Sequence, residues 1–241
     1  MQYKTRGIVL YSLNYSDAYS IVLIYTEEFG RVSYLVAKSR GKKTKVSKSL
    51  FHPLAVLDLD VEHQNLREIQ RLKEVRTHIP LLSLLDDPVK GTISIFLAEF
   101  VSKVIQEIQP NKLLFDYILH SVEVLNLTED HYANFHLVFL IQLTRFLGFY
   151  PDNSGYQRGM FFDLQNGTFV KYKPFHIHFL NPDDSAILYL ILRMNYKNMN
   201  NFQFSRFDRK AIIERTLEYY RLHLSPIPEI KSLEVLHEVF G

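Results

Sequence analysis

Residues 18–37, AYSIVLIYTEEFGRVSYLVA, decide the fold of this chain. Their first half holds five consecutive apolar residues, 21–25, a run typical of a strand that is buried on both faces. Phe29-Gly30-Arg31 then marks a tight turn. The residues after the turn alternate between two faces, with Val32, Tyr34 and Val36 against Ser33 and Leu35. We therefore predict two consecutive strands joined by a short turn.

Three further strands are predicted around this pair. Residues 5–15 form the first of them, and turn-forming residues 14–17 separate it from the pair. In residues 57–62 apolar and acidic side chains alternate, so one face of that strand contacts water. Residues 66–75 provide a fifth strand. Five short strands with one long connection, between the third and the fourth, favour a small closed barrel of the OB type.

After residue 80 the apolar period becomes helical. Asp87-Pro88 is a typical helix start, and a long apolar stripe follows it up to Ile108. The predicted fold class is therefore α+β multidomain, with a five-stranded OB-type barrel in residues 1–80 and a larger helical domain in residues 81–241. Within the latter, residues 150–180 are irregular and contain a small hairpin around Asn166-Gly167.

The composition of the chain excludes several kinds of site and of protein. The chain contains no cysteine, which excludes disulfides, thiol catalysis and thiolate metal sites. Its N-terminus does not resemble a signal peptide, and no stretch approaches the roughly 20 apolar residues that cross a bilayer. We expect a cytoplasmic protein with no membrane contact, no cofactor, no metal and no small-molecule substrate.

A basic segment carries the chemistry. Residues 1–80 hold 13 Lys/Arg and 8 Asp/Glu, a net charge of +5, whereas residues 81–241 hold 15 and 18, a net charge of −3. Within the front part, residues 38–48 include six basic and no acidic residues. Cations at phosphates release condensed counterions, so we predict sequence-independent nucleic-acid binding here. The residues predicted to bind nucleic acid are Lys38, Arg40, Lys42, Lys43, Lys45 and Lys48.

Other residues extend this prediction. Arg6 and Arg31 are expected to continue the basic face, and Tyr15 and Tyr19, beside a turn, are expected to be exposed and to stack on bases. Positive charge at the start of a predicted helix over residues 209–224 opposes the helix dipole and suggests a further DNA path. That path comprises Arg206, Arg209 and Lys210. The alternative is that these cations form only solvated surface.

Several short motifs, in order over nearly the whole chain, resemble the RecO family of bacterial DNA repair proteins. In the first half they are residues 7–10, Tyr15-Ser16-Asp17-Ala18, Phe29-Gly30-Arg31-Val32, Ala37-Lys38-Ser39-Arg40 and residues 50–54. In the second half they are residues 139–149, residues 219–224 and Lys231-Ser232.

The resemblance implies a non-enzymatic recombination mediator. Such a protein binds single- and double-stranded DNA, anneals complementary strands and helps to load RecA. Its implied partners are RecR and the acidic tail of single-strand binding protein, for which Arg145 and Phe149 are the candidate contacts. Many family members carry four zinc-binding cysteines after residue 149, and this chain has none, so we expect no zinc.

Two other functions stay open. The first is an OB-type RNA- or single-strand-binding protein of another pathway, which would depend on the 2′-hydroxyl if it bound RNA. The second is an enzyme on the helical scaffold, which would have a deep polar pocket outside the barrel. A metal pair at His176 and His178 is a weak alternative, because no third ligand is in view.

Overall fold

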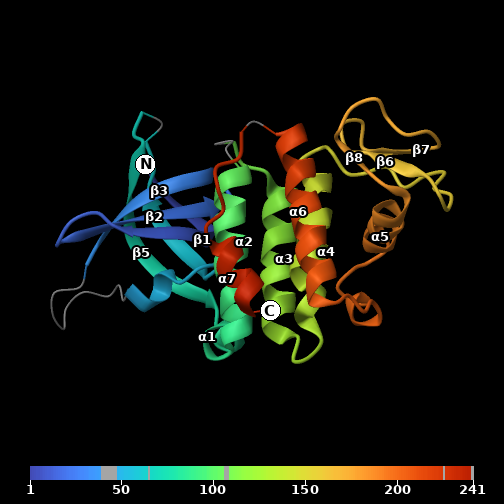
Figure 1. The fold of residues 1–241 in the computed structure, drawn as a ribbon. Coiled ribbons are helices and arrows are strands. Elements are labelled where there is room, and N and C mark those ends of the chain that lie inside the picture. Colours follow the sequence, from blue (N-terminus) through green and yellow to red (C-terminus); the bar gives the residue numbers. More distant parts are fainter. Residues whose placement is uncertain (39–47, 65, 106–108, 225, 240–241) are drawn as a thin grey trace. The chain divides into compact units, whose positions relative to one another are not determined.

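The computed structural model describes residues 1–38, 48–64, 66–105, 109–224 and 226–239. Five strands come first in the chain and close into a barrel, followed by helices, which confirms the predicted fold class (Figure 1). The order around the barrel is β1-β2-β3-β5-β4. The bounds are β1 Gln2–Asn14, β2 Tyr19–Thr26, β3 Gly30–Ala37, β4 Val56–Glu62 and β5 Ile69–Ile79, with a short 3-10 helix η1 at Lys48–Phe51.

The barrel interior is apolar and tightly filled. Only β3 and β5 pair in parallel, whereas the other four pairs of neighbours are antiparallel. Gly7 lies inside, where a Cβ atom would come within 2.5 Å of Ile24 and 2.7 Å of Leu59. The interior cluster comprises Val9, Val22, Ile24, Val32, Tyr34, Val36, Phe51, Ala55, Leu57, Leu59, Val61 and Val75.

Helices cover part of the outer barrel surface. Ile8 and Leu10 face outward from β1 and are buried, and α2 packs against this strand. Tyr25 of β2 lies against Phe115 of α3, with ring centroids 6.2 Å apart, and its hydroxyl donates to the Asn111 carbonyl oxygen. The first three helices are α1 Leu82–Asp86, α2 Pro88–Val104 and α3 Lys112–Leu127.

The start of α2 agrees with the prediction for Asp87-Pro88. The Asp87 carboxylate accepts hydrogen bonds from the backbone N–H groups of Val89 (2.8 Å) and Lys90 (3.2 Å), and Pro88 occupies the first helical position. These contacts satisfy two of the backbone donors that a helix start leaves without partners.

Contacts divide the chain into two compact units. Unit 1 comprises Met1–Leu127 and Pro228–Val239, and unit 2 contains Thr128–Ile227. Unit 1 therefore includes α1–α3 and the last helix, α7 Ser232–Val239, in addition to the barrel. The predicted domain boundary near residue 80 differs from this division, and an independent barrel domain stays a prediction.

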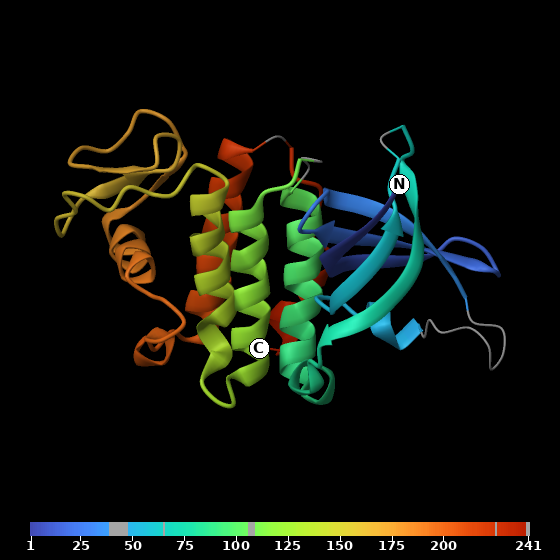
Figure 2. The same ribbon diagram turned by 180° about the vertical axis from the view of Figure 1, so that it is seen from behind.

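Helix α7 lies against α2 within unit 1, as both views show (Figures 1 and 2). Glu99 of α2 accepts hydrogen bonds from the backbone N–H groups of Lys231 (3.0 Å) and Ser232 (2.8 Å) and from the Ser232 hydroxyl. Lys103 forms an ion pair with the same carboxylate. Burial alone would raise the pKa of Glu99, but the contacts from Lys103, Ser232 and Lys231 outweigh it and lower the pKa to about 2.

Unit 2 combines helices with a small three-stranded sheet in the order β7-β6-β8. Strands β6 and β7 form the predicted hairpin around Asn166-Gly167, and β8 pairs with the other edge of β6. The bounds are η2 Tyr132–Asn134, α4 Phe135–Phe146, β6 Phe161–Asp163, β7 Thr168–Val170, β8 Phe179–Leu180, α5 Pro182–Leu192, η3 Met199–Asn201 and α6 Arg206–His223.

Some predicted boundaries are wrong by several residues. The fifth strand begins at Ile69 and continues to Ile79, not from residue 66 to 75. Helix α6 begins at Arg206, because Ser205 and Asp208 form a reciprocal capping box there. No helix in the described part of the chain is long and apolar enough to cross a membrane.

Candidate nucleic-acid interface

The basic segment begins beside the β1–β2 turn. The backbone N–H of Lys38 donates to the Ala18 carbonyl oxygen (2.8 Å), and its Nζ donates to the Ser16 carbonyl oxygen. Lys48 lies in η1, and nothing further is described of it. The predicted DNA contacts Arg40, Lys42, Lys43 and Lys45 lie outside the described residues.

The β1–β2 turn presents two tyrosines next to Lys38. The Ser16 hydroxyl accepts hydrogen bonds from the backbone N–H groups of Ala18 (3.3 Å) and Tyr19 (3.2 Å). The N–H groups of Tyr15 and Ser16 both donate to the Tyr19 carbonyl oxygen. This network fixes the turn, and Tyr15 and Tyr19 are exposed, as expected. Their contact with bases stays a prediction.

An apolar surface continues from these tyrosines over the outside of the barrel. A bulge between Val9 and Tyr11 changes which side chains of β1 face outward. Beyond it, strand register aligns outward residues in rows across β1, β2 and β3. We call this surface the open face. Its residues are Tyr11, Leu13, Tyr19, Ile21, Leu23, Leu35 and Ile69, of which Ile21, Leu23 and Leu35 are half-buried and the others exposed.

Sequence reasoning missed most of the open face. The run over residues 21–25 favours a strand buried on both faces, but Ile21 and Leu23 are only half-buried. A usable signal was the alternation of Tyr11, Leu13 and Tyr15 with polar residues. Arg71, exposed on β5 and paired in register with Leu35, adds a cation beside the open face.

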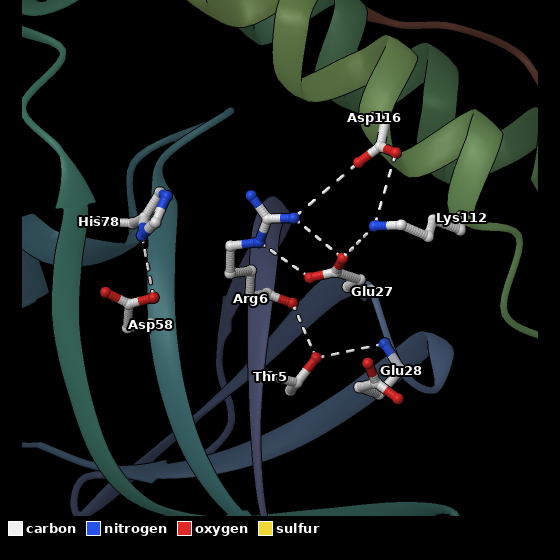
Figure 3. Close-up of polar contacts among 8 residues, drawn as sticks. All are labelled: Thr5, Arg6, Glu27, Glu28, Asp58, His78, Lys112 and Asp116. Atoms are coloured by element: carbon white, nitrogen blue, oxygen red, sulfur yellow. Dashed lines mark hydrogen bonds and ion pairs between the residues drawn. The ribbon is translucent and has the colours of Figure 1, made fainter.

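Arg6 has partners within the protein (Figure 3). Its guanidinium donates two hydrogen bonds to Glu27, at 2.8 and 2.9 Å, and its Nη2 lies 3.9 Å from an oxygen of Asp116. Lys112 at the start of α3 also contacts Glu27, at 2.6 Å, and Asp116, at 3.6 Å. The Arg6 hydrogen bonds and the Lys112 charge outweigh burial and lower the pKa of Glu27 to about 2.

This network joins β1 and the β2–β3 turn to α3 in unit 1. Two cations and two carboxylates balance each other, so Arg6 adds no excess positive charge to the surface. Nearby, the Thr5 hydroxyl donates to the Arg6 carbonyl oxygen and accepts from the Glu28 N–H, and His78 pairs with Asp58 at 2.9 Å (Figure 3). Contact of Arg6 with DNA stays a prediction.

Arg31 lies at the opposite end of β3 from Lys38 and is half-buried. Its register partner is Tyr25, the residue that α3 covers. Its Nε atom is buried and has no hydrogen-bond partner within the described structure. The structure therefore places Arg31 away from the β1–β2 turn, and its role in binding stays a prediction.

The basic residues of α6 differ in exposure. Arg206 and Lys210 are exposed on the first turns, whereas Arg209 donates from Nη1 to the Phe204 carbonyl oxygen (2.6 Å). Burial lowers the pKa of Arg209 from its ordinary value. Asp208 caps the helix from its first turn, so the positive charge there is partly compensated. Arg206 and Lys210 remain the better candidates for an anionic ligand.

The two candidate partner contacts occupy different environments. The guanidinium carbon of Arg145 lies 3.7 Å from the Tyr150 ring centroid, and this side chain is exposed. Phe149 instead packs in the aromatic cluster of unit 2. Its ring lies 5.1–5.8 Å, between centroids, from those of Tyr219, Tyr220 and His223. Of the two, only Arg145 presents its side chain openly to a partner.

The two histidines of the weak metal alternative each contact a different carboxylate. His176 pairs with Asp163 at 3.3 Å, and His178 pairs with Glu218 at 3.1 Å. Among the residues that the structure describes, no group of three or more potential ligands could hold a metal ion.

A cavity of about 590 Å³ lies between α5 and α6 in unit 2. Its floor is apolar, with Phe162, Leu180 and Ile191 among the residues that line it. Asp184, Glu214 and Arg215 also line it. We find no arrangement of a nucleophile and a base around this cavity in the described residues.

Comparison with known proteins gives matches over almost the whole chain. A model of the "Recombination protein O N terminal" family matches residues 1–79, and one of the "Recombination protein O C terminal" family matches residues 85–234. A protein named "DNA repair protein RecO" from Azobacteroides pseudotrichonymphae is 58% identical over 240 residues, covering 100% of both chains. Proteins of the same name from Phocaeicola vulgatus and Flavobacterium johnsoniae are 42% and 31% identical, also with 100% coverage.

Proposed function

This chain belongs to the RecO family of DNA repair proteins, and we propose that it acts as a recombination mediator that binds single- and double-stranded DNA and anneals complementary strands. The observation that carries the proposal is the position of Lys38 in the same turn region as the exposed Tyr15 and Tyr19. The basic segment begins at the turn that presents both tyrosines, and the open face extends from that turn.

Each part of this surface has a distinct role in binding. Lysine and arginine in residues 38–48 contact phosphates and release counterions, which gives affinity without sequence preference. Tyr15 and Tyr19, with Tyr11 on the open face, stack on unpaired bases. In a double helix the faces of the bases are already stacked on each other. Duplex DNA therefore contacts only the cations of this surface.

Annealing follows from charge and needs no bond-making. Two DNA strands repel each other, and cations bound to the phosphates of both lower that repulsion. In the same proposal, the protein helps to load RecA onto coated single strands and contacts RecR. Unit 2 offers Arg145, already held over Tyr150, as a cation for the acidic tail of single-strand binding protein.

Charge reversal at Lys42, Lys43 and Lys45 tests the proposal. The Lys42→Glu, Lys43→Glu, Lys45→Glu variant should lose most single-strand affinity at physiological salt. The slope of log affinity against log salt should also fall by about 2, because each lost phosphate contact removes about 0.7. Circular dichroism should show an unchanged fold.

A Lys4→Glu, Arg158→Glu, Lys197→Glu variant controls for net charge, because it also reverses three charges, and all three residues are exposed and lie outside the proposed surface. It should keep most of the affinity. Retained affinity in the triple variant would reject the basic segment as the binding site.

A further inference from the structure

A loop joins β7 to β8 in unit 2 (Figure 1). Large apolar side chains of this loop are exposed. Tyr172, Phe175 and Ile177 are 85%, 111% and 83% exposed. Exposed apolar side chains that cluster in one short segment usually mark a binding surface. We call residues 171–178 the histidine-braced loop, because His176 and His178 tie it to Asp163 and Glu218.

Two histidines determine which side chains of this loop point outward. His176 is held by Asp163 at 3.3 Å, and His178 is held by Glu218 at 3.1 Å. In addition, the His178 carbonyl oxygen accepts a hydrogen bond from the Leu164 N–H (3.1 Å). The rings of His176 and His178 lie 6.4 Å apart, and both residues are half-buried. Their neighbours Phe175 and Ile177 instead point into solvent.

The charge of the surrounding sequence favours an anionic ligand. Lys171 and Lys173 flank Tyr172, and residues 165–182 contain no aspartate or glutamate. The carboxylates of Asp163 and Glu218 are turned to the two histidines. Lys173 also lies 5.3 Å from the Phe179 ring centroid.

We propose that the histidine-braced loop is a second contact for single-stranded DNA, in which Tyr172 and Phe175 stack on bases and Lys171 and Lys173 contact phosphates. Aromatic platforms between cations bind single strands with little sequence preference, because every base has a stacking face. The loop is already held in place, so little ordering is needed on binding.

This inference rests on the proposed function and extends it. One chain would hold single strands at two places, one in each unit. A protein with two separate contacts can hold two strands, or two parts of one strand, at once. That property suits the annealing of complementary strands.

Tryptophan fluorescence provides a direct test, because the chain contains no tryptophan. A Phe175→Trp variant therefore reports on the loop alone. Binding of oligo(dT) should quench its emission, because a base stacks on the indole, and salt should weaken the effect. Leu85→Trp is the control. Leu85 is exposed on α1 beside Asp86, so its emission should not change.

A second set of variants asks whether the loop binds independently. Quenching of Phe175→Trp should persist at higher oligonucleotide concentration in the Lys42→Glu, Lys43→Glu, Lys45→Glu background. Adding Lys171→Glu and Lys173→Glu should abolish it. In an otherwise unchanged chain, Tyr172→Ala with Phe175→Ala should lower single-strand affinity about tenfold and leave duplex affinity nearly unchanged.

Each result decides a different point. If Tyr15→Trp is quenched but Phe175→Trp is not, the loop is not a DNA contact and the proposed function stands. If neither is quenched, both proposals fail. If Phe175→Trp brightens and shifts to the blue with phosphatidylglycerol vesicles, without responding to oligo(dT), the loop binds a lipid surface and the inference is wrong.

Discussion

Single residues in this chain differ in how far their roles follow from sequence. The exposure of Tyr15 and Tyr19 was expected from their place beside a turn, and it is confirmed. By contrast, the carboxylates that surround Arg6 come from distant parts of the chain, at Glu27 and Asp116. No local pattern shows such a pairing, because it depends on the register of β1 with β2 and on the placement of α3.

Gly7 tests the packing of the barrel interior. Because a Cβ atom there would overlap Ile24 and Leu59, Gly7→Ala should destabilise the fold by about 1–3 kcal/mol. Gly91→Ala is the matched control. A Cβ atom at Gly91, in α2, would lie 3.5 Å from its nearest neighbour, the Leu84 carbonyl oxygen of α1, and the change should stabilise by about 0.5–1 kcal/mol. Urea unfolding measures both, and equal effects would contradict the packing argument.

Glu27 gives unit 1 a dependence on pH. Its folded pKa of about 2 lies below the ordinary value of 4.5, so its contribution is fully present above pH 4.5 and is lost as pH falls toward 2. Glu27→Gln should therefore lower stability at pH 7 by about 1 kcal/mol, after allowance for solvent screening. Thermal unfolding should show this difference shrinking between pH 4.5 and pH 2. A constant difference across that range would show that the charge of Glu27 is not the cause.

Among the elements, those with strong local signals were predicted well. Alternation located β3 and β4, and the Asp87-Pro88 pair located the start of α2. Predictions of element bounds were wrong where contacts between distant parts of the chain determine where an element forms or ends. Strand β5 continues to Ile79 because β4 pairs with it that far, and two-residue β8 exists only through its pairing with β6. The bulge in β1, which creates the open face, likewise has no sequence signal that we recognised.

Helix α7 depends on one carboxylate for its start. Removing the Glu99 side chain leaves the N–H groups of Lys231 and Ser232 without their acceptor, at a cost of about 1–3 kcal/mol. Glu99→Ala should therefore speed hydrogen exchange in residues 231–239 well before the barrel is affected. Glu238→Ala, at an exposed position of the same helix, is the control and should exchange as the original chain does. Unchanged exchange in Glu99→Ala would mean that α7 is held by its apolar contacts alone.

At the scale of the whole molecule, the chain leaves unit 1 after α3 and returns to it for α7. The predicted division at residue 80 follows the change of apolar period, and the two family models also meet between residues 79 and 85. Contacts group the elements differently, because α2 and α3 cover Ile8, Leu10 and Tyr25 of the barrel. Periodicity shows what each segment forms, but it does not show which segments bury each other.

Two fragments distinguish these divisions. Residues 1–80 alone would expose the three side chains that α2 and α3 cover, so we expect this fragment to aggregate or to bind a hydrophobic dye. Residues 1–127 joined by a flexible Gly/Ser linker to residues 228–239 should be monomeric and unfold in one cooperative transition. Sedimentation and denaturant unfolding check both. A soluble, cooperative 1–80 fragment would instead support the predicted boundary.

The return of the chain to α2 also fixes an order of events during synthesis. Residues 228–239 leave the ribosome only after the 100 residues of Thr128–Ile227, which takes about 5–20 s at 5–20 residues per second. Until then the site on α2 for Leu236 has no occupant from its own polypeptide. During that interval unit 1 of the nascent protein is incomplete, because its last helix is missing. This is the period in which binding of a chaperone would protect the chain most.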